Sequence, residues 1–121
     1  MSTFRAEKSY PDFVQNKIDE ITSHVAWYDD ITGTEAELLL RNKADLTYLL
    51  RPGEKEGHYY LTYVKGAAYF THIPLRVDNS LKEWFYMNAV NRMAPTLREF
   101  IPSVMHAEEA EVTALVPLTR M

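Results

Sequence analysis

The sequence predicts an α+β fold in which a central antiparallel sheet is flanked by helices. Three apolar runs, at about 46–51, 58–64 and 67–74, are separated only by short polar connections, which is typical of sequential strands. Segments with apolar residues at helical spacing precede and follow these runs. With 121 residues, 46% of them hydrophobic, the chain is large enough for one compact domain and too short for two ordinary ones.

Two helices are predicted ahead of the sheet. In YPDFVQNKIDEITSH, a proline stands where a first helical turn tolerates one, and the apolar residues that follow share one face of a helix at about 12–24. TGTEAELLLRNK opens with a threonine as a candidate cap and continues with good helix formers, which predicts a helix at about 33–42. We therefore treat residues 1–24 as an N-terminal helical extension and residues 25–121 as the main domain.

The first two strands are joined by the turn PGEKEG, in which a proline and two glycines break the apolar pattern. Arg51 lies at the end of the first of these strands. Arginine does not lose its proton, so a partly buried arginine normally has an anion as partner. That anion belongs either to the protein, with Glu54 and Glu56 nearby, or to a ligand. An ion pair within the protein is the commoner case for an isolated arginine at a strand end.

The chain beyond the third run changes to a helical pattern. Ser80 followed by Glu83 fits a capping box, and the apolar residues after it recur at helical spacing, which predicts a helix at about 80–93. PTLREFI predicts the start of another helix, and EVTALVPL predicts a closing strand. The sheet is thus expected to carry a helical insertion after its third strand.

Composition excludes several functions. The net charge of −4 argues against broad binding of nucleic acid or of anionic membranes. The absence of cysteine rules out thiol catalysis, disulfides and thiolate metal sites, and suits a reducing cytoplasm. The first residues lack the apolar core of a signal peptide, and no apolar run reaches a membrane-spanning length. The four histidines have no metal-ligand spacing and no cofactor motif is present, so we expect neither metal nor cofactor.

Several stretches, in order, resemble the Src homology 2 domain. WYDDITGTEAELLL is similar to the start of that domain, where a Trp-Tyr pair precedes a helix with Ala-Glu and a run of leucines. TYLLRPGEKEGHYYLTYV resembles its second and third strands, YFTHIPL its histidine-bearing fourth strand, and VTALVPL its terminal segment. The resemblance covers residues 27–75 well and the remainder loosely. It implies a non-catalytic module that docks on tyrosine-phosphorylated proteins or peptides.

The resemblance implies a phosphotyrosine site centred on Arg51. A guanidinium offers a fork of donors that matches two phosphate oxygens at once. The turn after Arg51 can present backbone N–H groups to an anion, and Lys55 adds a mobile positive charge. Thr62 and His72 match the hydroxyl and the histidine that flank the pocket. The complete predicted set is Arg51, Gly53, Glu54, Lys55, His58, Thr62 and His72.

Three positions depart from the family pattern, and each loses a side-chain donor. Gly33 stands where a second arginine is frequent, Gly53 where serine is usual, and Pro74 where lysine is usual. Either phosphate binding has been lost or neighbouring groups compensate, and we favour compensation because the arginine, threonine and histidine remain. The nearby candidates are Lys55, His58, Arg76 and backbone N–H groups.

The predicted helix at 80–93 is a further departure, because ordinary members continue there with a small sheet and a loop. It is either the second helix of the family or an insertion ahead of APTLREFIPSVM, and we favour the insertion. This arrangement resembles divergent domains of effectors secreted by intracellular bacterial pathogens, in which an inserted segment closes over phosphotyrosine. The resemblance implies Tyr86 and Met87 as a candidate lid, low selectivity for flanking sequence, and action in the host cell cytoplasm.

Two alternatives belong to other classes of protein. A small acidic α/β protein of the secretion-chaperone kind would hold an extended partner on apolar grooves, and would need a large exposed apolar patch but not Arg51. A small enzyme using His72 with a carboxylate has no recognisable motif in this sequence.

Overall fold

The computed structural model describes residues 12–55, 57–66, 68–78, 83–86 and 92–117. These residues form the predicted α+β fold, which contains a six-stranded, mainly antiparallel sheet and three α-helices. The helices are α1 (Asp12–Thr22), α2 (Gly33–Leu40) and α3 (Leu97–Val104). The strands are β1 (Thr47–Pro52), β2 (His58–Lys65), β3 (Tyr69–Asp78), β4 (Glu83–Tyr86), β5 (Arg92–Ala94) and β6 (Thr113–Ala114).

The centre of the sheet is the predicted meander of three strands. β2 pairs antiparallel with β1 and with β3, and the order across the whole sheet is β5-β4-β3-β2-β1-β6. β6 pairs in parallel with the start of β1, on the edge of β1 that faces away from β2. An isolated parallel bridge joins Trp27 to Leu50, two residues further along β1. The first two helices and the first two strands lie within two residues of their predicted bounds, whereas β3 runs on past residue 74 to Asp78.

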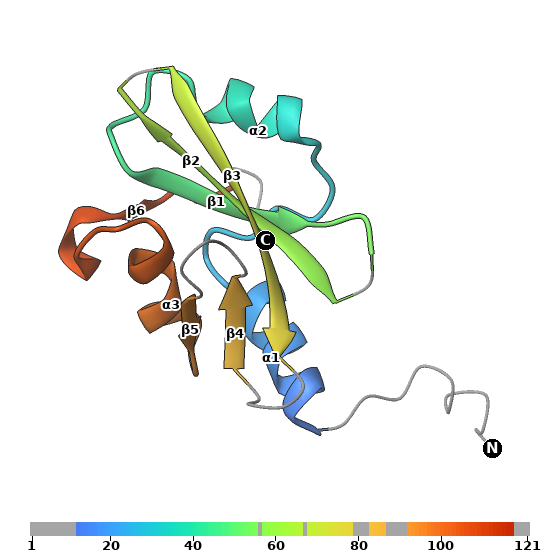
Figure 1. Ribbon diagram of the computed structural model, residues 1–121. Helices are drawn as coiled ribbons and strands as arrows, with labels where there is room; N and C mark the ends of the chain where they lie inside the picture. Colours follow the sequence, from blue (N-terminus) through green and yellow to red (C-terminus); the bar gives the residue numbers. More distant parts are fainter. Residues whose placement is uncertain (1–11, 56, 67, 79–82, 87–91, 118–121) are drawn as a thin grey trace.

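Alternation along the strands gives the sheet two different faces. On one face Leu49 and Val64 form a small core with Ala36 and Leu40 of α2. On the opposite face lies the main core, which contains Leu50 and residues of α1 and α3. Figure 1 shows α2 beside the meander and away from α1 and α3, which lie near β4 and β5. Because β1 is covered on both faces, its residues 47–51 are all buried.

The predicted helix at 80–93 is wrong, because strands β4 and β5 occupy the described parts of this segment. The continuation of β3 provides an edge on which β4 pairs, with Phe85 opposite Arg76. Trp84 is fully buried in the main core. The next residue, Phe85, packs against Arg76, whose guanidinium carbon lies 4.6 Å from the centre of the Phe85 ring. Consecutive residues that are buried on opposite faces are typical of a strand. Residues 79–82 and 87–91 lie outside the described residues.

The second half of the chain therefore contains the small sheet that was expected to be missing. The predicted insertion is not present in the described residues, and the helix in APTLREFIPSVM is α3, which begins after the N-cap residue Thr96. The predicted closing strand is confirmed as β6, which adds to the edge of β1 through Thr113 and Ala114.

Helix α1 is joined to the same core as the sheet. Its Ile21 is fully buried in the main cluster. One oxygen of Glu20 accepts a hydrogen bond from the Trp84 indole at 2.9 Å, and the other accepts from the backbone N–H of Leu97 at 2.6 Å. Lys17 donates to the carbonyl of Pro95. The Glu20 carboxylate thus satisfies a free N–H at the start of α3 while binding α1 to β4.

Among the described residues, no helix has both the length and the apolar character needed to cross a bilayer.

Candidate functional site

Arg51 projects from β1 toward the face of the sheet that α2 covers. Leu49, two residues earlier, packs against α2, and Leu50 between them faces the main core. The alternation of the strand therefore places Arg51 at the edge of the small core below the start of α2. Its side chain is buried, with a residue exposure of 8%. A permanent cation in this position requires hydrogen-bond partners.

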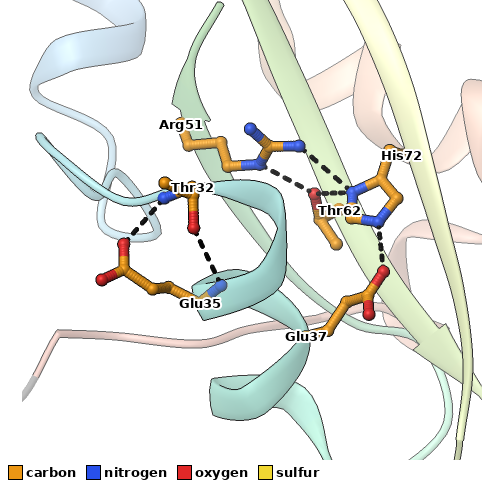
Figure 2. A network of polar contacts seen from close by, with 6 residues as sticks. All are labelled: Thr32, Glu35, Glu37, Arg51, Thr62 and His72. Atoms are coloured by element: carbon orange, nitrogen blue, oxygen red, sulfur yellow. Dashed lines mark hydrogen bonds and ion pairs between the residues drawn. The ribbon is translucent and has the colours of Figure 1, made fainter.

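The structure brings Arg51, Thr62 and His72 together, as the sequence predicted (Figure 2). Arg51 Nε donates to Thr62 Oγ1 at 3.2 Å, and its Nη2 lies 3.2 Å from His72 Nδ1. Thr62 Oγ1 is also 2.9 Å from His72 Nδ1. Thr62 and His72 are directly opposite each other on β2 and β3, so the sheet register sets these contacts.

Glu37 of α2 completes this network, and sequence reasoning did not include it in the site. Its Oε2 lies 2.7 Å from His72 Nε2. Because the guanidinium of Arg51 can only donate, His72 Nδ1 must accept, and the ring proton then lies on Nε2 and is donated to Glu37. The carboxylate therefore fixes the histidine tautomer that suits Arg51. Glu37 and His72 are 35 positions apart in the chain, so only the fold brings them together.

The guanidinium of Arg51 keeps donors for a ligand. Two of its roughly five N–H groups are used in the contacts with Thr62 and His72. Its central carbon lies 4.5 Å from the centre of the Tyr60 ring, which holds the plane of the guanidinium in place. Within the described part of the chain, no carboxylate lies within 4 Å of Arg51. An ion pair with Glu54 is therefore not formed, and Glu56 lies outside the described residues.

Electrostatics at Arg51 favour an anion. Burial lowers the pKa of the Arg51 guanidinium, while the nearby Tyr60, Glu54 and Glu37 act in the opposite direction. The group stays charged at neutral pH because arginine starts from so high a value. Desolvation makes the charge costly without a close partner, so an anion that reaches the guanidinium is bound more strongly than in water.

The N-terminus of α2 lies next to the guanidinium. Thr32 caps the helix through a capping box with Glu35. Gly33, the first residue of α2, lies so close to Arg51 that a Cβ built on it would be 3.1 Å from Arg51 Nη2. The absence of a side chain at Gly33 thus leaves room for the guanidinium against the helix. The first N–H groups of a helix carry partial positive charge, which adds to the field at this point.

Gly53, Glu54, Lys55 and His58 line a hollow of about 180 Å³. Arg51 is not part of its lining, but Tyr60, which stacks on the Arg51 guanidinium, is. The floor of the hollow is the turn that joins β1 to β2, closed by a hydrogen bond of 2.8 Å from Gly53 N to His58 O. Lys55 and His58 are exposed there, so both can move toward a ligand. The lining residues are Gly53, Glu54, Lys55, His58, Tyr59, Tyr60 and Pro74.

The turn also explains why serine is absent from position 53. A Cβ on Gly53 would lie 2.8 Å from the backbone oxygen of His58, a contact that only a shift of the turn can relieve. We expect Gly53→Ser to weaken phosphate binding and to destabilise the protein by about 1–3 kcal/mol, as overpacking does. Thermal unfolding and phosphate titration measure the two effects. Gly57→Ser is the comparison for backbone strain without a clash, since its Cβ meets nothing within 4 Å and its φ of +82° alone disfavours a side chain. A gain in phosphate affinity for Gly53→Ser would contradict this account.

The structure gives the predicted lid no support. Tyr86 packs against the main core, on the face opposite Arg51, and Met87 lies outside the described residues. Arg76, a predicted compensating group, lies on the same face as Arg51, stacked on Phe85. In the described part of the chain, no group of three or more metal-ligating side chains is found.

Comparison with known proteins adds one result. A family model described as SH2 domain matches residues 27–102, which is more than half of the chain. The matched range contains α2, β1 to β5 and the predicted phosphate-binding residues, and it excludes α1 and β6. A search of curated proteins returned no match.

Proposed function

The chain belongs to the SH2 domain family, whose members are phosphotyrosine-binding modules, and we propose that it binds phosphotyrosine with Arg51 as the central phosphate ligand. The ligand is a tyrosine-phosphorylated protein or peptide. Members of this family generally bind without catalysing a reaction, and we propose the same for this chain. The predicted site residues all lie on or beside the α2 face of the meander.

The single observation that carries this proposal is the state of Arg51. Its guanidinium is buried, is held by Thr62 and His72, and has no carboxylate within 4 Å in the described residues. Its orientation is set before a ligand arrives, so little side-chain entropy is lost on binding. A phosphate dianion supplies the negative charge that Arg51 lacks nearby. Its oxygens accept hydrogen bonds from the Arg51 N–H groups that no protein group uses.

We propose that backbone groups replace the missing side-chain donors. Gly33 brings the positive end of α2 to the site. In the turn, the N–H groups of Gly53 and His58 are already donated to His58 O and Lys55 O, so the backbone donors that we propose there are those of Glu54 and Lys55. Lys55 contributes a mobile charge at the rim. The tyrosine ring of the ligand would lie over Tyr60 and Pro74, which are directly opposite each other on β2 and β3. Those two residues offer apolar contact in place of the usual lysine.

Calorimetric titration of the 121-residue chain tests the proposed function. Three peptides of one sequence are compared, carrying phosphotyrosine, tyrosine and phosphoserine. We expect only the phosphotyrosine peptide to bind measurably, because phosphoserine is too short to reach Arg51 past Tyr60 and Pro74. Equal binding of the tyrosine peptide would overturn the proposal. Equal binding of the phosphoserine peptide would limit it to general phosphate recognition.

The Glu37 carboxylate opposes a phosphate in this site, since it lies 2.7 Å from the histidine that contacts Arg51. Glu37→Gln keeps a hydrogen-bond acceptor for His72 and removes the negative charge. We expect phosphotyrosine affinity to rise by about 0.2–1 kcal/mol, up to about fivefold, because the pair is partly exposed. The gain should shrink as salt is raised. Glu99→Gln, at an exposed position of α3 on the other face of the sheet, is the control for net charge. A loss of affinity in Glu37→Gln would show that the charge itself helps phosphate binding.

Selectivity for flanking sequence stays a prediction. Low selectivity was expected because a helix was thought to replace the small sheet, and β4 and β5 stand there instead. A library of phosphotyrosine peptides with varied flanks tests the prediction directly. A narrow range of affinities supports low selectivity. A sharp preference at one flanking position would show that residues beyond the Arg51 pocket read the peptide.

The resemblance to effectors of intracellular bacterial pathogens also stays a prediction. Its ground was the inserted helix, and that helix is wrong, since β4 and β5 occupy the described parts of the segment. We propose action on phosphorylated proteins in a host cell cytoplasm on the resemblance alone. Recovery of tyrosine-phosphorylated host proteins by the parent chain, and not by an Arg51 variant, tests this step.

A further inference from the structure

A second concave site lies on the other face of the sheet, between α1, α3 and β6. It is a cleft of about 390 Å³, within the size range of small-molecule sites. Its apolar wall is formed by Leu97, Ile101 and Pro102 from α3 with Val112 and Ala114 near the end of the chain. His24, which follows α1, and Tyr48 of β1 bring two rings to the cleft, with centres 6.2 Å apart.

The hydroxyl of Tyr48, a residue that lines this cleft, is a candidate donor for a ligand. Tyr48 is buried, with only 6% of its surface exposed, and its hydroxyl makes no hydrogen bond within the described residues. Every fully buried polar side-chain atom in the described part of the chain has a partner, so this unpartnered oxygen keeps some accessible surface, and Tyr48 is one of the residues that line the cleft. Buried tyrosine hydroxyls usually find a hydrogen-bond partner. Burial raises the pKa of the Tyr48 phenol, so it keeps its proton and can donate.

Charges around the cleft are already paired. Arg98 Nε lies 2.7 Å from Glu109 Oε2. Glu20 forms an ion pair with Lys17 at 3.7 Å and accepts hydrogen bonds from Trp84 and Leu97. No other lysine or arginine lines the cleft. An anionic ligand would face two carboxylates with no unpaired cation to offset them, so the site favours a neutral group.

We propose that this cleft is a second binding site, for a small neutral aromatic ring that carries a hydrogen-bond acceptor, with Tyr48 as the donor. The ring would pack between α3 and the His24 and Tyr48 rings, and the acceptor would meet the Tyr48 hydroxyl. The site is separated from Arg51 by the sheet, because Tyr48 and Arg51 project from opposite faces of β1. It therefore does not depend on phosphotyrosine binding.

Benzamide is the probe for this site, since it is neutral and joins one ring to one carbonyl acceptor. Titration followed by amide chemical shifts in the full chain should give saturable changes at residues lining the cleft. Tyr48→Phe removes only the hydroxyl and should weaken benzamide binding by about two- to tenfold, the loss of one hydrogen bond. Benzoate, which has the same ring with a negative charge, should bind more weakly than benzamide.

Two matched variants sharpen the test. Tyr63→Phe removes a hydroxyl from the residue opposite Tyr48 on β2, outside the cleft, and should leave benzamide affinity unchanged. Ala114→Leu adds bulk inside the cleft and should reduce binding. The proposal is overturned if benzamide gives no saturable shifts up to its solubility limit. It is also overturned if Tyr48→Phe, folded as judged by its spectrum, binds benzamide as the parent does.

Discussion

Arg51→Ala is expected to abolish measurable binding of a phosphotyrosine peptide. The substitution removes the buried guanidinium and leaves the phosphate partly desolvated without its charged partner, a cost of about 2–5 kcal/mol in buried interfacial pairs. Thr62 and His72 lose their common donor at the same time. Calorimetric titration of parent and variant with one phosphopeptide measures the effect.

Two further variants show whether the geometry of Arg51 matters as well as its charge. Arg51→Lys keeps the charge but loses the planar fork, so we expect an affinity between those of the parent and the alanine variant. Arg98→Ala removes an equal charge from an exposed position whose side chain is 81% accessible, and should leave binding unchanged. Near-parental affinity in a folded Arg51→Ala protein would show that the phosphate binds elsewhere.

Ile21→Ala is expected to destabilise the domain by about 2–5 kcal/mol, the usual cost of emptying a fully buried aliphatic site. Ile21 lies in α1, outside the range matched by the family model, yet it is fully buried in the same cluster as Trp84 and Phe100. Urea unfolding measures the free energy. Leu38→Ala is the comparison, because Leu38 is also helical but 59% exposed, and a change within about 0.5 kcal/mol is expected there.

If Ile21→Ala unfolded with the same midpoint as the parent, α1 would not be part of the cooperative unit. Glu20→Gln offers an independent check on the same contact, since the amide nitrogen would oppose either the Trp84 indole or the Leu97 N–H. If Glu20→Gln destabilised the protein and Ile21→Ala did not, the contribution of α1 to stability would come from the hydrogen bonds of Glu20 and not from the burial of Ile21.

The sequence was sufficient for the meander and for the central part of the site. Apolar runs, a turn with two glycines and a short Lys65-Gly66 connection are local signals, and they predicted the strands on which Arg51, Thr62 and His72 meet. The length of β3 was underestimated at Pro74. Proline lacks an N–H group but is tolerated where no neighbouring strand needs one, and β4 begins to pair only from Arg76 onward.

The error at 80–93 has a physical cause. Trp84 and Phe85 fit a helical spacing with their neighbours and an alternating strand equally well, because two adjacent aromatic residues do not define a period. What decides between the two is the free edge of β3, a non-local partner that a single sequence does not reveal. Glu37 was missed for a related reason, since its role depends on a histidine far along the chain.

The alternation of β1 and β2 has a consequence for how the chain can change in length. Arg51 and Thr62 face α2, while their neighbours Leu50 and Leu61 face the main core. An insertion or deletion of one residue within either strand would exchange these faces, turning the cation into the core and a leucine toward the ligand. The constraints in the turn between the strands are local ones: Gly53 lies against the backbone of His58, and Gly57 has a φ of +82°. A change confined to this turn leaves the two strand faces in place, whereas a change within a strand exchanges them.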